Sequence, residues 1–330
     1  MNEADTQKAL DAYFRLMSMK GAVEVFHAAR RAAVLDAFSA GPLTAGEVAA
    51  RCSLDVRATT LLLEALCAAD VLAKNGDEYR AAPVLPLLSG PYQDLSSLYW
   101  DYLPEFLKSG HPMQRMDSPE EGQAQYAAQA ASLYGMMLPS ATAAARMLKI
   151  GLERRNVNIL DVGAGAGVWG IRFAQHDAGA RVTAVDWPGV LLVAKGFAER
   201  AGLLDRFTAC AGNYHTVDLP SCAFDLAVAA NIAHLETEST LTDLFMRLHS
   251  ALKPGGSMLV VDVFHGHPGG ELNSALYELG LALRTEHGRV HGRFTLEACL
   301  AKAGFGAGAY HPIPVPPHTM GMIIAQKGVD

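Results

Sequence analysis

The chain has 330 residues, half of them apolar and 18% charged, and this length suggests two domains. Such a composition can bury a large core and excludes an intrinsically disordered chain. The net charge of −7 argues against sequence-independent binding of nucleic acid. No apolar run is long enough to span a membrane. Five scattered cysteines without CxxC spacing indicate neither a disulfide framework nor a zinc site. The acidic, polar start MNEADTQKALDAY does not resemble a signal peptide, so a soluble cytoplasmic protein is expected.

Residues 1–92 are predicted to form a helical domain that closes with a small hairpin. Apolar residues recur at three- and four-residue intervals over 8–38, which indicates a helix. Thr44, followed three residues later by Glu47, has the capping-box spacing that starts a second helix, and a third helix follows. An Asn75-Gly76 turn then joins two short strands. Helix, helix, helix and hairpin is the order of elements in a winged helix.

Residues 93–150 are predicted to form a helical connector punctuated by prolines, namely Pro104, Pro112, Pro119 and Pro139. This segment is rich in tyrosine, tryptophan and methionine, and we expect most of these side chains to pack in the core. A few of them, Tyr126, Tyr134 and Met137, are predicted to line an apolar cleft that faces the domain that follows.

The pattern changes within residues 151–330, where strands alternate with helices. Buried strands are predicted in VNILDVG, RVTAVDW, FDLAVAANIAH and SMLVVDVF, with helices near 168–176, 190–201 and 241–252 between them. After a helix over 295–303, we expect AYHPIPVPP to be irregular and MGMIIAQ to be a closing strand. Strands alternating with helices indicate an α/β domain with a doubly wound parallel sheet that is covered on both faces.

The strongest functional signal is the run Asp161-Val-Gly163-Ala-Gly165-Ala-Gly167 at the end of the first of these strands. Glycines at such a strand-to-helix turn let a ligand press against the backbone and direct N–H groups at it. Dinucleotide sites have the motif GxGxxG, which residues 165–170 match literally. Sites for S-adenosylmethionine instead have an acidic residue followed by GxGxG. Because the turn begins at Gly163, a dinucleotide motif would have to be counted from that residue. Counted from there, the sequence does not match GxGxxG. An acidic residue also suits a ligand that carries an ammonium and a sulfonium, so the register favours S-adenosylmethionine.

Further residues are predicted to hold the same ligand at neighbouring strand ends. Asp186 ends the second strand, where a carboxylate can accept both ribose hydroxyls. Trp187 follows it and is a candidate for packing near the adenine. Gly212, Asn213 and Tyr214 fall where the next strand of such a sheet delivers its loop, and an amide beside an aromatic ring suits adenine recognition.

Five segments together resemble a known family: ILDVGAGAG, AVDWPGV, AGNYHTVDLP, NIAH and ALKPGGSMLVVD. They are similar to the class I S-adenosylmethionine-dependent O-methyltransferases. The segment GPLTAGEVAARCSLDVRATTLLLEALCAADVLAKNGDEYRAAP narrows the likeness to small-molecule methyltransferases of secondary metabolism with an N-terminal winged-helix dimerisation domain. The resemblance covers nearly the whole chain. It implies a Rossmann-like domain, S-adenosylmethionine as cofactor, a small-molecule acceptor, a homodimer, and Asn231 among the cofactor-binding residues.

The resemblance also implies a general base. The family has a histidine after an asparagine and two apolar residues, which here is His234, and it would take the proton of a hydroxyl acceptor. The family pattern continues with Asp-Trp, whereas this chain has Leu-Glu. The first of two acids that orient the histidine falls at Asp262. The second falls near 289–291, where the chain has no carboxylate and Glu286 is the nearest acid.

Other functions stay open. The incomplete acid set leaves room for S- or C-methyl transfer to a thiol, a thioether or an activated carbon by proximity and orientation. A winged-helix regulator that senses a ligand is a non-enzymatic alternative, but residues 1–110 carry 10 Lys and Arg against 14 Asp and Glu, and a DNA-reading face is normally basic. An NAD-dependent oxidoreductase rests on the literal GxGxxG match. No metal is expected, because a third ligand at recognisable spacing is missing beside His265, His267, His287 and His291.

Overall fold

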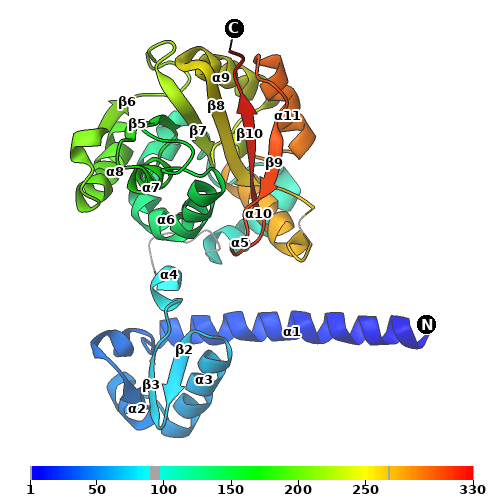
Figure 1. The fold of residues 1–330 in the computed structure, drawn as a ribbon. Helices are drawn as coiled ribbons and strands as arrows, with labels where there is room; N and C mark the ends of the chain where they lie inside the picture. Colours follow the sequence, from blue (N-terminus) through cyan, green and yellow to red (C-terminus); the bar gives the residue numbers. More distant parts are fainter. Residues whose placement is uncertain (1, 90–96, 267, 330) are drawn as a thin grey trace. The chain divides into compact units, whose positions relative to one another are not determined.

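The computed structural model describes residues 2–89, 97–266 and 268–329, which fall into two compact units (Figure 1). The units span Met1–Gly90 and Pro91–Asp330. The expected domain boundary at residue 92 lies outside the described residues, and the expected connector after it belongs to the second unit. Over the described ranges, no helix combines the length and the apolar character needed to cross a membrane.

The first unit consists of a long helix and a small body with a three-stranded sheet. The helix is α1 (Glu3–Arg31), and the body comprises η1 (Asp36–Ala40), β1 (Leu43–Thr44), α2 (Ala45–Cys52), α3 (Val56–Ala68), β2 (Leu72–Asn75), β3 (Glu78–Ala81) and α4 (Leu85–Ser89). The strand order is β1-β3-β2, and both pairs are antiparallel. Leu63, Leu66 and Tyr79 are buried in the core that the helices and the sheet share.

The capping box and the hairpin of this unit are both present. Thr44 Oγ1 accepts a hydrogen bond from Glu47 N–H at 3.3 Å, and the Glu47 carboxylate accepts one from Thr44 N–H at 2.7 Å. The predicted turn was wrong by one residue, because Asn75 pairs with Glu78 and leaves Gly76-Asp77 as the loop. Gly76 has a φ of +60°, a left-handed conformation that glycine adopts without steric cost.

The second unit begins with two helices, α5 (Ser97–Ser109) and α6 (Pro119–Met147). Pro112 lies in the break between them, but Pro104 and Pro139 lie inside the helices and do not end them, so the expectation that they punctuate the segment was wrong. Helix α6 continues past Pro139 because its last turns pack on the sheet. Its final part carries small residues that are fully buried there, Ala141, Ala144 and Ala145.

A seven-stranded sheet forms the centre of the second unit. Its strands are β4 (Asn158–Val162), β5 (Arg181–Asp186), β6 (Phe207–Ala211), β7 (Phe224–Ala230), β8 (Leu252–Val263), β9 (Ala309–Pro312) and β10 (Met320–Gln326). The order is β6-β5-β4-β7-β8-β10-β9, parallel from β6 to β8, with β10 antiparallel to β8 and β9 antiparallel to β10. The predicted doubly wound α/β fold is confirmed. The stretch expected to be irregular contains β9, and β6 was not among the strands predicted from the sequence.

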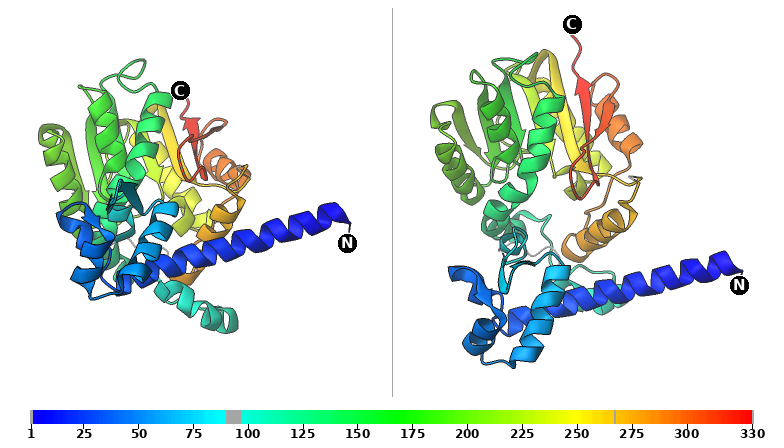
Figure 2. Two further views of the ribbon diagram at one scale, coloured as in Figure 1. Left: turned by 90° about the horizontal axis from the view of Figure 1, so that it is seen from below. Right: turned by 60° about the horizontal axis from the view of Figure 1, so that its bottom comes forward.

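Helices cover both faces of this sheet (Figures 1 and 2). They are α7 (Val168–His176), α8 (Pro188–Arg200), α9 (Glu238–Ala251), α10 (Glu271–Arg284) and α11 (Arg293–Lys302), with short turns η2 (Leu204–Arg206) and η3 (Ala233–Leu235). Side chains of β4 alternate between two cores: Ile159 packs with residues of α6, α7 and α10, and Leu160 packs with residues of α9 and α11. Helix α10 had not been predicted from the sequence.

Candidate active site

The strand order reverses between β4 and β7, which are neighbours in the sheet although β5 and β6 come between them in the chain. A crevice opens outside the carboxyl ends of parallel strands at such a switch point. A cavity of about 640 Å³ lies there in this protein. Its wall is formed by the segments that follow β4, β5, β6 and β7, together with parts of α6 and α10.

The loop after β4 presents bare backbone to the cavity. Gly163, Gly165 and Gly167 have left-handed φ angles of +62°, +56° and +76°. A Cβ on Gly163 would lie 2.5 Å from Cγ2 of Ile232, so only glycine lets the loops after β4 and β7 approach each other here. A Cβ on Gly165 would meet no atom within 4 Å, so the backbone at this position borders open cavity.

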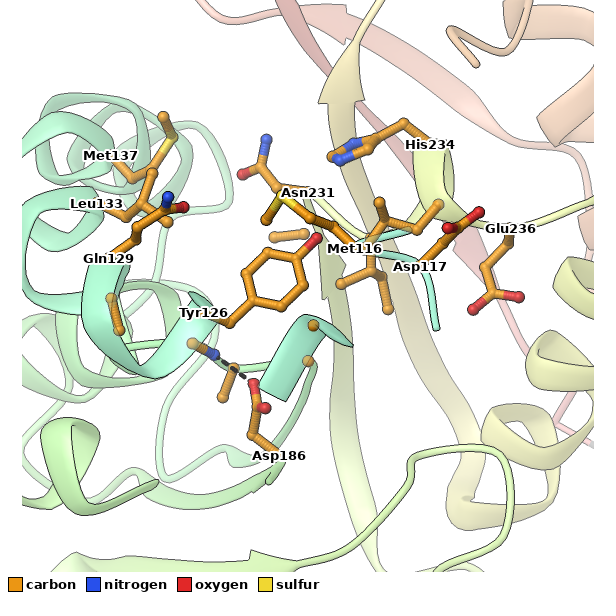
Figure 3. Close-up of a pocket in the computed structure, with 18 of the residues that line it drawn as sticks. Met116, Asp117, Tyr126, Gln129, Leu133, Met137, Asp186, Asn231, His234 and Glu236 are labelled. Atoms are coloured by element: carbon orange, nitrogen blue, oxygen red, sulfur yellow. Dashed lines mark hydrogen bonds between the residues drawn. The ribbon is translucent and has the colours of Figure 1, made fainter. Parts of the chain in front are cut away.

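Asp186 anchors this loop from the end of β5. Gly165 N–H donates to Asp186 Oδ2 at 2.8 Å (Figure 3). Trp187 N–H donates to Oδ1 of the same carboxylate at 2.7 Å. Burial raises the pKa of the Asp186 carboxyl, and the two amide hydrogen bonds act against that rise. Both Asp186 and Trp187 line the cavity.

Asp161 lies behind the cavity wall. Its side chain is 1% exposed, and its Oδ2 accepts a hydrogen bond from Gly170 N–H in the first turn of α7 at 2.9 Å. The pKa of Asp161 is raised to about 7. Burial is the main cause, the Gly170 hydrogen bond acts against the rise, and the nearby Asp186 adds to it. The carboxylate therefore fastens β4 to α7 and supports the glycine loop from behind.

A second buried carboxylate meets the loop after β6. Glu236 Oε1 accepts hydrogen bonds from Tyr214 OH at 2.6 Å and from His215 Nε2 at 2.8 Å. Burial acts to raise the pKa of Glu236, but the hydrogen bonds from His215, Thr240 and Tyr214 leave that pKa lowered. Asn213 Oδ1 accepts from His215 N–H at 2.8 Å. The sequence predicted Asn213 and Tyr214 as site residues but not their neighbours His215 and Glu236. A glutamate at the position where the family has tryptophan could have indicated Glu236.

Asn231 follows directly after β7 in a left-handed conformation, with a φ of +58°. Its backbone N–H donates to Val261 O at 2.8 Å. Its side-chain Oδ1 is buried in the cavity wall and has no hydrogen-bond partner among the described residues. An unpaired buried amide oxygen destabilises the folded protein, so this atom is a candidate acceptor for a hydrogen-bond donor on a ligand.

His234 reaches the cavity from the turn after β7, with its ring on the side of Asn231 (Figure 3). Asp262 Oδ1 lies 2.8 Å from His234 Nδ1, and Asp262 Oδ2 accepts from the backbone N–H of His234 at 3.1 Å. An ionised carboxylate only accepts, so Nδ1 carries a proton and the lone pair is on Nε2. The hydroxyl of Tyr277, on α10, lies 3.3 Å from Nδ1 and 3.4 Å from Nε2.

Helix α6 supplies the opposite wall of the cavity. Figure 3 shows four side chains of this helix directed inward, Tyr126, Gln129, Leu133 and Met137. Tyr134 also lines the cavity, and its ring stacks on Phe197 with 3.8 Å between the centroids. This wall is largely apolar and aromatic, which suits a flat organic molecule.

The structure brings most of the predicted site residues to this one cavity. The residues that line it are Gly163, Gly165, Asp186, Trp187, Asn213, Tyr214, Asn231, His234, Tyr126, Tyr134 and Met137. Those behind the wall are Asp161, Gly167, Gly212 and Asp262. Glu286 is exposed and is not among the residues that line the cavity with His234, so it does not take the place of a second acid there. Within the described ranges, no three histidine, cysteine or acidic side chains gather as a metal site would require.

A family model described as an O-methyltransferase domain matches residues 117–306, more than half of the chain. The matched range contains the glycine loop, Asp186, Asn231 and His234. The chain belongs to this O-methyltransferase family. It is an S-adenosylmethionine-dependent methyltransferase, and the cofactor expected from the glycine register is confirmed.

Similar proteins agree with this assignment. The 3-hydroxy-5-methyl-1-naphthoate 3-O-methyltransferase of Streptomyces sahachiroi is 25% identical over 272 residues, covering 78% of this chain and 79% of the relative. The L-tyrosine C(3)-methyltransferase of Streptomyces lavendulae is 30% identical over 174 residues, covering 51% of this chain and 47% of the relative. Human N-acetylserotonin methyltransferase in complex with SAM has the same fold, with a TM-score of 0.71, 21% identity and 99% coverage of both chains.

Proposed function

We propose that this methyltransferase transfers the methyl group to the hydroxyl of a small aromatic acceptor, with His234 as general base. The observation that carries the proposal is the His234–Asp262 pair at the cavity, where Asp262 holds Nδ1 at 2.8 Å. A histidine held in this way keeps its Nε2 lone pair for a substrate proton. The aromatic and thioether wall of α6 supports a flat acceptor.

The residues around the glycine loop fit the cofactor. The loop leaves backbone bare at Gly163 and Gly165, Asp186 offers carboxylate oxygens at a strand end, and Asn231 Oδ1 lacks a donor. These four residues, with Trp187, Asn213 and Tyr214, would hold S-adenosylmethionine. When bound, it supplies a methyl group activated by a sulfonium. Asp161 contributes from behind, by holding the loop.

The chain's own residues then prepare the acceptor. The side chains of α6 and α10 hold its ring and exclude water from the cavity. His234 Nε2 takes the hydroxyl proton, so the O–H bond breaks and its electron pair stays on the oxygen, which becomes the nucleophile. Asp262 stabilises the imidazolium that forms, and the proton later passes to solvent.

The ring carbon beside the hydroxyl is a second candidate for the methylated atom. The likeness to the relative named L-tyrosine C(3)-methyltransferase favours it. Loss of the phenol proton activates the neighbouring carbons as well as the oxygen, so the same base would serve. Product analysis by mass spectrometry and NMR distinguishes an aryl ether from a C-methyl phenol.

The first unit would bring two chains together. Its helix α1 exposes apolar side chains along much of its length, and the sequence resembles a winged-helix dimerisation domain. We therefore include a homodimer in the proposal.

The test compares two flat phenols of different acidity, 1-naphthol and 4-nitro-1-naphthol, at pH 8. The first holds its proton and needs a base, whereas the second is already ionised. We expect His234→Ala to lower kcat for 1-naphthol by roughly 10²–10⁴ and for the nitro compound by less than about tenfold. His265→Ala, which alters an exposed histidine outside the cavity, is the control. Calorimetry should show unchanged binding of S-adenosylhomocysteine in both variants.

An equal loss for the two naphthols would contradict the role of His234 as a base. Methylation of thiophenol but of neither naphthol would show that the acceptor is not an aromatic hydroxyl.

A further inference from the structure

Tyr277 stands on the face of the His234 ring. Its oxygen is almost equally far from the two ring nitrogens, at 3.3 and 3.4 Å. An oxygen in the imidazole plane at those distances would overlap the carbon between the nitrogens. The two rings are inclined by 85°, with their centroids 5.6 Å apart, so the phenol points end-on at the imidazole face with its hydroxyl over the ring.

Asp262 alone does not fix the plane of the His234 ring. The Asp262 carboxylate contacts the ring only at Nδ1, and it also accepts from the backbone N–H of His234. Val263 N–H donates to the same carboxylate at 2.8 Å. A ring held at one nitrogen can still swing about that hydrogen bond. The Tyr277 hydroxyl blocks one of the two directions of swing, and this keeps the direction of Nε2 constant.

The phenol is itself supported from α10. The guanidinium carbon of Arg284, two turns further along this helix, lies 5.8 Å from the centre of the Tyr277 ring. The Arg284 residue is only 9% exposed, so the Tyr277 ring has a buried cation near it while its hydroxyl contacts the imidazole. A phenol packed in this way can transmit its position to the histidine.

The contact occupies the role that the family pattern gives to an acid. The sequence has no carboxylate near 289–291, and the exposed Glu286 is not among the residues that line the cavity. When the imidazole gains the proton, a phenol oxygen over its face can turn a lone pair toward the ring, and this favours the positive charge. Tyr277 thus provides orientation and charge stabilisation without a second carboxylate.

We propose that Tyr277 is the positioning residue that completes the general base of this enzyme in place of a second acid. This proposal rests on the proposed function of His234. The positioning depends on the hydroxyl of Tyr277 and not merely on its ring.

The experiment uses Tyr277→Phe in the full-length enzyme with 1-naphthol and 4-nitro-1-naphthol. We expect kcat for 1-naphthol to fall about tenfold, kcat for the nitro compound to change less than about twofold, and KM for both to stay within about twofold. Tyr102→Phe is the matched control, because its hydroxyl bonds to His111 O outside the cavity. The double variant His234→Ala/Tyr277→Phe should lose no more activity than His234→Ala alone, since Tyr277 acts through the histidine.

The outcomes separate this inference from the proposed function. If His234→Ala spares the ionised naphthol and Tyr277→Phe behaves like the wild type, the inference on Tyr277 is wrong and His234 remains the base. If Tyr277→Phe raises KM for both naphthols alike, the tyrosine contacts the acceptor and does not position the base. If His234→Ala itself fails to discriminate between the naphthols, the proposed function fails first.

Discussion

The buried carboxyl of Asp161 links the glycine loop to the pH dependence of stability. Burial is the main reason that its pKa is raised to about 7, well above the value in an unfolded chain. Between about pH 4 and 7 the folded protein therefore keeps a proton that the unfolded chain has released. Its contribution to the free energy of unfolding falls as the pH rises through that window, and the loss is complete above pH 7.

Replacing Asp161 by asparagine should remove this dependence. The amide can still accept from Gly170 N–H and never ionises. We expect Asp161→Asn to raise Tm relative to the wild type by several degrees more at pH 8 than at pH 5, in scanning calorimetry without cofactor. Asp243→Asn, at an exposed position on α9, is the control and should show no such difference. The same change in Tm at both pH values would show that Asp161 does not titrate with folding.

Residues at strand ends could be predicted from the sequence, and so could Tyr126, Tyr134 and Met137 on α6, whereas Tyr277 on α10 could not. Asp186, Asn231 and His234 follow visible apolar runs, and parallel strands bring their carboxyl ends to one edge of a sheet. Tyr277 lies 43 residues after His234 on a helix, and no sequence period relates the two. The register of the glycines identified the cofactor, but only the packing of α7 shows that Asp161 faces Gly170 instead of the cavity.

At the scale of elements, the capping box of α2 is a local device whose contribution can be measured. Its two hydrogen bonds join Thr44 and Glu47. Losing the hydroxyl costs about 1 kcal/mol of helix stability, so Thr44→Ala should speed amide exchange in α2 about fivefold. Hydrogen exchange with mass spectrometry on peptides covering 45–52 provides the measurement. Thr44→Ser keeps the cap and should exchange like the wild type, and equal acceleration in both variants would contradict the assignment.

Elements with clear start signals were predicted, and those without were missed. Helix α2 has its capping box, whereas α10 begins after Gly270, whose position offers no side-chain cap, and Gly280 interrupts its pattern. Strand β6 is an edge strand with several exposed residues, so it lacks the apolar run of β4. The prolines in α5 and α6 do not end these helices, because packing offsets the hydrogen bond that each proline removes. Helix α5 packs on α10, and the last turns of α6 are buried in the core beside the sheet.

At the scale of the whole molecule, α1 shows an apolar surface that its own unit leaves uncovered. Of its 29 residues only Ala29 is buried. The exposed apolar side chains are Leu10, Tyr13, Phe14, Leu16, Met17, Met19 and Val23. Several of them recur at helical spacing and form a stripe, and a stripe of this size is normally covered by a partner. A second copy of α1 across a two-fold axis would cover both stripes at once.

This arrangement predicts a dimer that depends on α1. Sedimentation equilibrium at micromolar concentration should give about twice the chain mass of 35.1 kDa for the wild type. The double variant Phe14→Glu/Met17→Glu places charges in the middle of the stripe and should give the monomer mass, because burying them without partners is costly. Leu192→Glu/Phe294→Glu changes two apolar residues that are at least as exposed but lie outside α1, and it should stay dimeric. A monomeric wild type, or equal dissociation of both variants, would show that α1 is not the dimer contact.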